Sequence, residues 1–141
     1  MLQETHSVPT DAQTWKKEWG GEILYSHGTF NSKGVAILLP QHLNITVEGT
    51  VADDMGRYLS VKINYDDNIF TIVNVYAPTK DKPVEQLVFF DSILPLLDNS
   101  DINTIVGGDF NICLNNIDKS GGRVEPPSSY ASRIKTFLEE Y

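Results

Sequence analysis

The sequence has few of the features that identify several common protein classes. Its single cysteine, Cys113, can form no internal disulfide, which is compatible with a reducing compartment. No stretch approaches the roughly 20 consecutive apolar residues that a membrane-spanning helix requires, and the first residues lack the basic and apolar regions of a secretory signal. We therefore expect no membrane association and a nuclear or cytoplasmic location.

Clustered basic residues are also missing. The net charge is -8, and the lysines and arginines are scattered, so the chain has no broad basic surface for nucleic acid. An acidic chain can still act on phosphodiesters if a divalent cation bound to its carboxylates supplies positive charge locally. Charge therefore leaves two classes open: a metal-using enzyme, or a domain with no role on nucleic acid.

The 141 residues, 40% of them hydrophobic, suit one packed domain. A short helix is predicted at residues 11–18, where Thr10 and Gln13 form a capping-box pattern. Trp15 and Trp19 lie one turn apart, so we expect them to form the helix face that packs on the core.

Strands are predicted from the apolar segments that follow. They cover residues 22–26, 34–39, 43–51, 58–65 and 69–77. In the fourth, Leu59, Val61, Ile63 and Tyr65 alternate with polar residues, as in a strand with one buried face. The fifth is nearly continuous in apolar residues, which is typical of a strand buried on both faces. The two strands are predicted to form a hairpin.

The second half of the chain alternates between helix and strand. From Pro83, the spacing of Val84, Leu87, Val88 and Leu94 predicts an amphipathic helix that ends at residues 95–99. A buried strand at 102–106 follows, and Gly107-Gly108 then permits a tight turn before Asp109. Residues 115–129 are predicted to be a loop, and a last helix would carry four residues on one face: Ile134, Phe137, Leu138 and Tyr141. Stacked sheets covered by helices, with unpartnered sheet edges, are expected.

Four polar residues follow or end apolar strands: Glu4, Tyr76, Asp109 and Asn111. A rigid sheet can hold side chains at such positions in an open cleft. Glu4 is a hard oxygen ligand suited to Mg²⁺, Asp109 could accept a proton from water, and the Asn111 amide could stabilise charge on a phosphoryl oxygen.

Each residue also has an ordinary structural explanation. A lone Glu or Asp is more often a solvated surface residue, Gly-Gly-Asp is a common turn composition, and Tyr76 is one of six tyrosines. Tyrosine is enriched in strands because it packs well. Spacing alone would therefore leave the chain as a mixed α/β domain without an assigned function.

Four motifs in order carry a more specific signal: Leu2-Gln-Glu-Thr-His6, Gly34-Val-Ala-Ile-Leu38, Asn74-Val-Tyr-Ala-Pro78 and Gly108-Asp-Phe-Asn111. In this order the chain resembles the endonuclease/exonuclease/phosphatase superfamily, closest to the apurinic-endonuclease-like nuclease domain of LINE-type non-LTR retrotransposons. The resemblance covers essentially the whole chain. It implies an α+β fold of the deoxyribonuclease I-like type, a four-layer α/β/β/α sandwich truncated at both ends.

The resemblance also implies a role for each candidate. Glu4 corresponds to the family's Mg²⁺ ligand, with Mn²⁺ as a possible substitute, and Tyr76 to the tyrosine that contacts the scissile phosphate. Asp109 would orient or deprotonate the attacking water, and Asn111 would steady the phosphoryl transition state. The implied activity is nicking of DNA to leave a 3′-hydroxyl that primes reverse transcription, with a reverse-transcriptase domain C-terminal to this segment.

The sequence departs from the family pattern in three ways. No residues precede the Gln-Glu motif that could form the first strand and its asparagine, no Asp-His dipeptide closes the chain, and Thr79 stands where many relatives carry asparagine. Residues 1–141 are therefore interpreted as a partial domain that is inactive or nearly so in isolation, because catalytic residues act as a unit. Two alternatives are a non-catalytic remnant and a phosphatase or phosphoesterase of the same superfamily.

Overall fold

The computed structural model of the protein describes residues 1–98, 103–112 and 132. A short 3-10 turn, η1 (Pro9–Asp11), precedes the main elements. These are α1 (Ala12–Trp19), β1 (Glu22–Ser26), β2 (Val35–Leu39), β3 (Ile45–Ala52), β4 (Tyr58–Tyr65), β5 (Asn68–Tyr76), α2 (Pro83–Asp98) and β6 (Thr104–Asp109). Neither helix in this part of the chain is long and apolar enough to cross a membrane.

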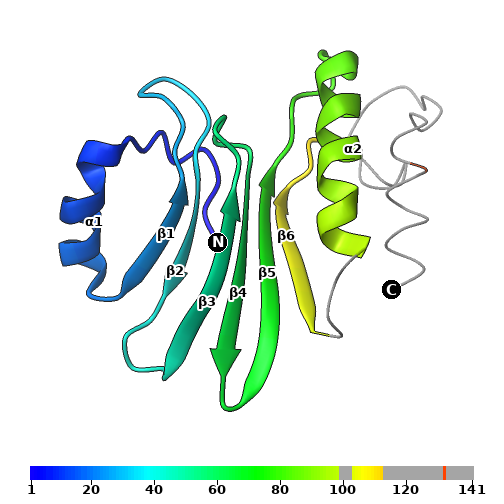
Figure 1. The fold of residues 1–141 in the computed structure, drawn as a ribbon. Helices are drawn as coiled ribbons and strands as arrows, with labels where there is room; N and C mark the ends of the chain where they lie inside the picture. Colours follow the sequence, from blue (N-terminus) through cyan, green and yellow to red (C-terminus); the bar gives the residue numbers. More distant parts are fainter. Residues whose placement is uncertain (99–102, 113–131, 133–141) are drawn as a thin grey trace, which may run out of the picture.

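The strands of the described residues form two sheets. β1 and β2 are antiparallel, while β3, β4, β5 and β6 form a second sheet in which β6 runs parallel to β5. Figure 1 shows α1 beside β1 on one side of the molecule and α2 along β5 and β6 on the other. The predicted α+β class and the predicted α/β/β/α layering are confirmed.

Two apolar clusters fill the spaces between these layers. The cluster between the sheets consists of buried residues from β2, β4 and β5: Val35, Ile37, Leu39, Leu59, Val61, Ile63 and Tyr76. The cluster under α2 joins the opposite face of β5 to the helix: Val73, Val75, Ala77, Phe89, Phe90 and Ile93. β5 thus has core on both faces toward its end, which fixes the position of Tyr76 and of the residues after it.

The predicted hairpin is confirmed as β4 and β5, which pair from Tyr65 with Asn68 around an Asp66-Asp67 turn. Both turn residues have left-handed backbone angles, φ 52° and 59°, the conformation that two-residue hairpin turns favour. In the hairpin, the predicted burial was wrong at two places. Tyr65 is 39% exposed because it borders this turn, and β5 is buried on both faces only from Val73 onward.

The strand predicted as buried at 102–106 is β6, but Ile105 is 49% exposed. The strand continues through Gly107-Gly108 to Asp109 without the predicted turn.

Both helices differ from the prediction in detail. The Thr10–Gln13 capping box is wrong: Pro9 already starts the 3-10 turn, and the Asp11 carboxylate instead accepts the Val8 backbone N–H at 2.9 Å. In α2 the predicted apolar face is wrong, since Val84 is 73% exposed. Phe89, Phe90 and Ile93 are buried in its place, because these larger side chains remove more apolar area from water.

The two tryptophans of α1 lie at the edge of the fold and not in the core. No residue of α1 is buried. Trp15 packs against Tyr25 with ring centroids 6.0 Å apart, while Trp19 is 44% exposed and donates its indole N–H to Leu39 O at 3.1 Å. The helix is short and covers only the outer side of β1, so its side chains stay partly in solvent.

Several predictions lie outside the described residues. These are the start of the strand at residue 102, Cys113, the loop at 115–129 and the last helix with Ile134, Phe137, Leu138 and Tyr141.

Candidate active site

The segment that carries Glu4 is held in place by backbone pairing on both sides. Leu2 forms an antiparallel bridge with Ala36, and Thr5 N donates to Gly34 O at 3.0 Å. Between these contacts Glu4 adopts a left-handed backbone conformation, with φ 51°, and its side chain is exposed. Strained conformations of this kind persist only where neighbouring structure fixes them, and pairing with β2 and its preceding loop contributes to fixing Glu4.

Tyr76 ends β5, and its side chain is 8% exposed. Its hydroxyl donates a hydrogen bond to Glu4 Oε1. This hydrogen bond raises the pKa of Tyr76, and burial and the negative charges of Glu4 and Asp109 raise it further. The phenol therefore remains protonated at physiological pH and acts as a donor at this position.

Asp109 and Asn111 reach the same edge from β6. The parallel register of β5 and β6 places Asp109 opposite Tyr76, and Ala77 N donates to Asp109 O at 2.8 Å. Asn111 has a left-handed backbone, φ 50°, and its N–H donates to Asp109 Oδ1 at 2.9 Å. Its side-chain amide donates to Ala77 O at 2.8 Å. The structure thus brings Glu4, Tyr76, Asp109 and Asn111 to one end of the sheets.

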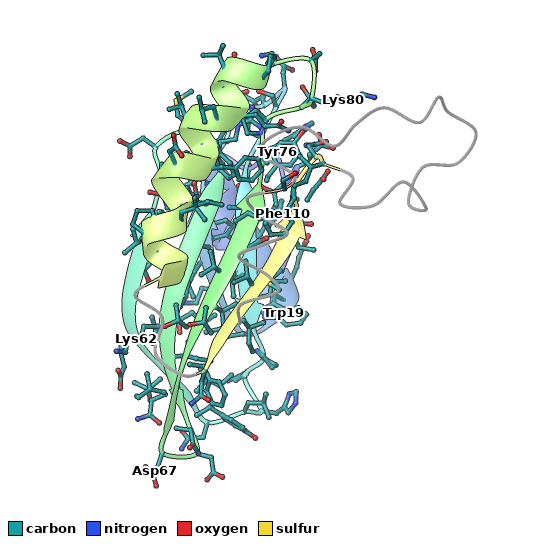
Figure 2. The ribbon with its side chains drawn as sticks, turned by 90° about the vertical axis from the view of Figure 1, so that its right-hand side faces the viewer. Trp19, Lys62, Asp67, Tyr76, Lys80 and Phe110 are labelled. Atoms are coloured by element: carbon teal, nitrogen blue, oxygen red, sulfur yellow. The ribbon has the colours of Figure 1, made fainter. Side chains whose placement is uncertain are left out.

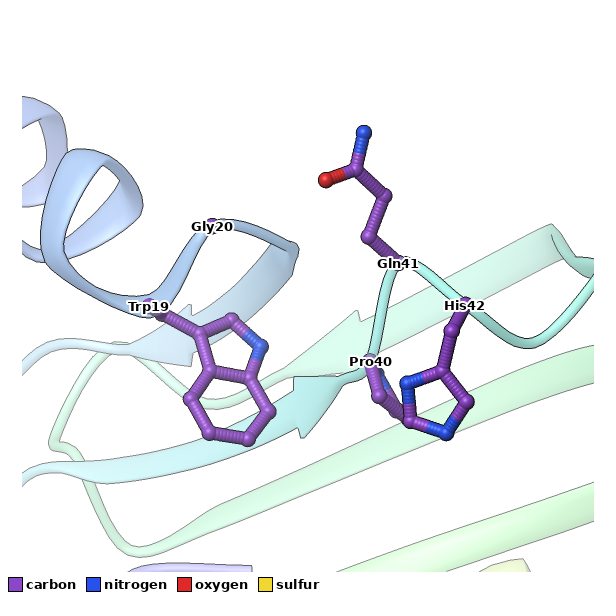
Figure 3. A pocket seen from close by; sticks show the side chains of 5 residues that line it. All are labelled: Trp19, Gly20, Pro40, Gln41 and His42. Carbon is purple, nitrogen blue, oxygen red and sulfur yellow. The ribbon is translucent and has the colours of Figure 1, made fainter.

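This end is distinct from the pocket that Figure 3 shows, which is lined by Trp19, Gly20, Pro40, Gln41 and His42. Figure 2 shows Trp19 well away from Tyr76, partway toward the Asp67 end of the sheets. None of the four candidate residues lines that pocket.

The chain is similar to the uncharacterized 149 kDa protein of Transposon TX1 from Xenopus laevis. The two are 33% identical over 122 residues, which cover 85% of this chain and 9% of that protein. The fold resembles a humanized D. rerio TDP2, at 16% identity and TM-score 0.61 over 79% of this chain and 51% of that chain. A truncated C. elegans TDP2 matches at 19% identity and TM-score 0.56 over 84% of this chain and 50% of that chain.

The transposon homologue, the fold and the ordered motifs agree with one another. The chain is thus similar in sequence to a transposon protein and shares its fold with the two TDP2 structures. No single family model matches the sequence. The chain spans only a small part of the transposon protein and about half of each TDP2 chain.

Arg57 lies beside the candidate residues and was not predicted from the sequence. Its Nη1 donates to Tyr76 O at 3.4 Å and to Ala77 O at 3.3 Å, and its guanidinium carbon lies 5.1 Å from the Tyr76 ring centroid. The hairpin register could have identified it, since pairing from Tyr65 with Asn68 places Arg57 opposite Tyr76. Arg57 supplies a cation beside an otherwise acidic group of residues.

The donor set fits a hard divalent cation that keeps most of its water. In the part of the chain that the structure describes, no three His, Cys, Asp or Glu residues lie together as a metal cage. Mg²⁺ usually takes only one or two protein carboxylates. The exposed Glu4 carboxylate uses Oε1 for the Tyr76 hydroxyl, so Oε2 faces no competing donor among the described contacts.

Replacing Glu4 with glutamine is expected to lower the pKa of Tyr76 toward its ordinary value of 10.0, because the variant loses the charge-assisted hydrogen bond that stabilises the neutral phenol. Ultraviolet titration of tyrosinate in the parent and in E4Q, each compared with its Tyr76→Phe derivative, isolates this tyrosine from the other five. An unchanged Tyr76 titration in E4Q would show that the two side chains do not interact in solution.

Proposed function

We propose that this chain provides the central part of a Mg²⁺-dependent DNA endonuclease encoded by a transposon, with Mn²⁺ as an alternative cation. The observation that carries the proposal is the meeting of Glu4, Tyr76, Asp109 and Asn111 at one sheet edge. The similarity to a transposon protein supports a DNA substrate, as does a D. rerio TDP2 of the same fold whose structure contains a single-strand DNA product.

In this proposal Glu4 holds the cation, which supplies positive charge to the scissile phosphate when bound. Glu4 keeps the Tyr76 hydroxyl protonated. When substrate binds, this hydroxyl donates to a phosphate oxygen in place of Glu4 Oε1. Asp109 is exposed at the end of β6 and can orient or deprotonate water. The Asn111 amide uses one N–H on Ala77 O and can direct its second N–H to a phosphoryl oxygen.

We further propose that the chain acts as part of a longer protein in the nucleus or cytoplasm, with a reverse-transcriptase domain after this segment. The sequence contains no Asp-His dipeptide, the pair that superfamily members use near the end of the domain. The 141 residues alone are therefore expected to turn over little or no substrate.

The test is nicking of supercoiled plasmid in the presence of Mg²⁺, with a longer transposon protein that contains this sequence and with the 141-residue chain. The longer protein is expected to nick, to leave an extendable 3′-hydroxyl, and to lose the activity in Asp109→Asn. Asp67→Asn is the matched control, because it makes the same chemical change at the opposite end of the sheets (Figure 2).

Nicking that survives Asp109→Asn would contradict the proposed site, and absence of nicking in the longer protein would contradict the activity. Release of phosphate from phosphomonoesters without nicking would favour the phosphatase alternative. Strong Mg²⁺-dependent nicking by the 141 residues alone would contradict only the expectation that the isolated chain is inactive.

A further inference from the structure

Asn74 carries a fully buried carboxamide in the middle of the fold, with 0% exposure. Its Nδ2 donates to Leu2 O at 2.8 Å and to Ala36 O at 3.0 Å, and its Oδ1 accepts a hydrogen bond from Gln3 Nε2 at 2.6 Å. Burying an amide is costly unless such partners are present. The side chain therefore connects three segments: β5, β2 and the N-terminal segment.

Asn74 and Tyr76 are two residues apart on β5, so their side chains point to the same face of the sheet. Asn74 bonds to Leu2 and Gln3, and Tyr76 bonds to the next residue, Glu4. Successive side chains of one strand thus hold successive residues of the N-terminal segment. Figure 1 shows the N-terminus lying over the region where the two sheets meet.

Few other side-chain contacts fix this segment. Leu2 is 43% exposed, so it has little apolar burial to hold it. Backbone pairing holds both ends of the segment, since Leu2 and Ala36 exchange two hydrogen bonds and Thr5 N donates to Gly34 O at 3.0 Å. Gln3 and Glu4 lie between these two contacts, and the buried Asn74 amide adds directed hydrogen bonds to Leu2 and Gln3, which specify register more strongly than a short backbone bridge does.

We propose that Asn74 is a positioning residue that sets the register of residues 2–4 on β5 and so places the Glu4 carboxylate. The importance of this placement rests on the proposed function, in which Glu4 is the cation ligand. Asn74 itself does not reach the reacting atoms, because its whole carboxamide is used inside the protein. An apolar residue of similar size would fill the space but would remove the acceptor of the Gln3 side chain and would leave the Leu2 carbonyl with the Ala36 N–H alone.

Two measurements on the 141-residue protein test the proposal. The first is the set of NMR cross-peaks between the Tyr76 ring and the Glu4 side chain, which requires no metal. The second is Mn²⁺ binding followed by electron paramagnetic resonance. In Asn74→Leu the cross-peaks are expected to disappear and the Mn²⁺ dissociation constant to rise about tenfold or more, the effect usual for residues that orient a ligand.

Val73→Ala is the matched control. Val73 is the preceding residue on β5, is equally buried, and faces α2 instead of the N-terminal segment. It should lower stability while leaving the cross-peaks and Mn²⁺ binding unchanged. Gln3→Leu removes the Gln3–Asn74 hydrogen bond by changing the half-buried partner, and it should reproduce the effect of Asn74→Leu. This second variant decides the test if Asn74→Leu fails to fold.

Asn74→Leu or Gln3→Leu protein that keeps the Tyr76–Glu4 cross-peaks would overturn the proposal, as would equal loss of the cross-peaks in Val73→Ala. If Glu4→Gln bound Mn²⁺ as tightly as the parent protein, the proposal that Glu4 holds the cation would be wrong. In that case the cross-peaks would still test the role of Asn74. Failure of the proposed cation site and failure of the proposed role of Asn74 are therefore distinguishable.

Discussion

Replacing Gly108 with alanine is expected to destabilise the protein by about 4 kcal/mol, near the upper end for a single substitution. Gly108 has φ +135°, a conformation that residues with a Cβ rarely adopt. An added Cβ would overlap Val75 O and would lie 2.8 Å from Val75 N. Both are backbone atoms of the neighbouring strand, so relief requires β5 and β6 to separate. The same movement would displace Asp109 from Tyr76.

Urea denaturation of Gly108→Ala measures this loss, and Gly107→Ala is the adjacent control. A Cβ at Gly107 would meet only the Met1 side chain, with Cε at 2.7 Å, and that flexible end can move away. We expect Gly107→Ala to cost less than about 1 kcal/mol, because the neighbour that must yield is a mobile side chain. Similar midpoints for the two variants would contradict the proposed close packing of β6 on β5.

The β4–β5 hairpin could be predicted from the sequence because its signals are local. Alternation of apolar residues defines one strand, a continuous apolar run defines the next, and two aspartates between them form the turn. The same local signals locate α2, but they could not determine which face it buries. That choice depends on the shape of the surface under the helix, where Phe89 and Phe90 fit and Val84 does not.

The residues of the candidate site could be predicted from the sequence, but the contacts between them could not. Glu4 and Tyr76 are 72 positions apart, and Gln3 and Asn74 are 71 apart, so their contacts depend on how the two sheets stack. Asn74 belongs to one of the four motifs, but the motif does not reveal that its amide is buried and bonded to residues 2 and 3. The roles of the four candidate residues remain predictions, while their placement at one edge gives those roles a common location.

Asp53→Ala is expected to destabilise the protein by about 3 kcal/mol, because one carboxylate organises the whole turn between β3 and β4. Asp53 accepts hydrogen bonds from Ser26 Oγ at 2.8 Å and from the backbone N–H groups of Met55, Arg57 and Tyr58 at 3.2, 2.7 and 3.0 Å. Removing an acceptor that satisfies partly buried donors costs about 1–3 kcal/mol for each unmet group, and solvent can reach some of them here.

Asp53→Ala should also disturb the candidate site, because the turn that Asp53 holds positions Arg57 against the Tyr76 ring. Asp54→Ala is the matched control: it removes the same charge from the next, exposed position of the turn. Urea denaturation measures the stability of both variants, and amide hydrogen exchange at Arg57 and Tyr58 measures the loss of the local bonds. If both variants lost equal stability, net charge and not the hydrogen bonds of Asp53 would hold this turn. Faster exchange at Arg57 and Tyr58 in Asp53→Ala alone would show that these hydrogen bonds hold the turn that carries Arg57.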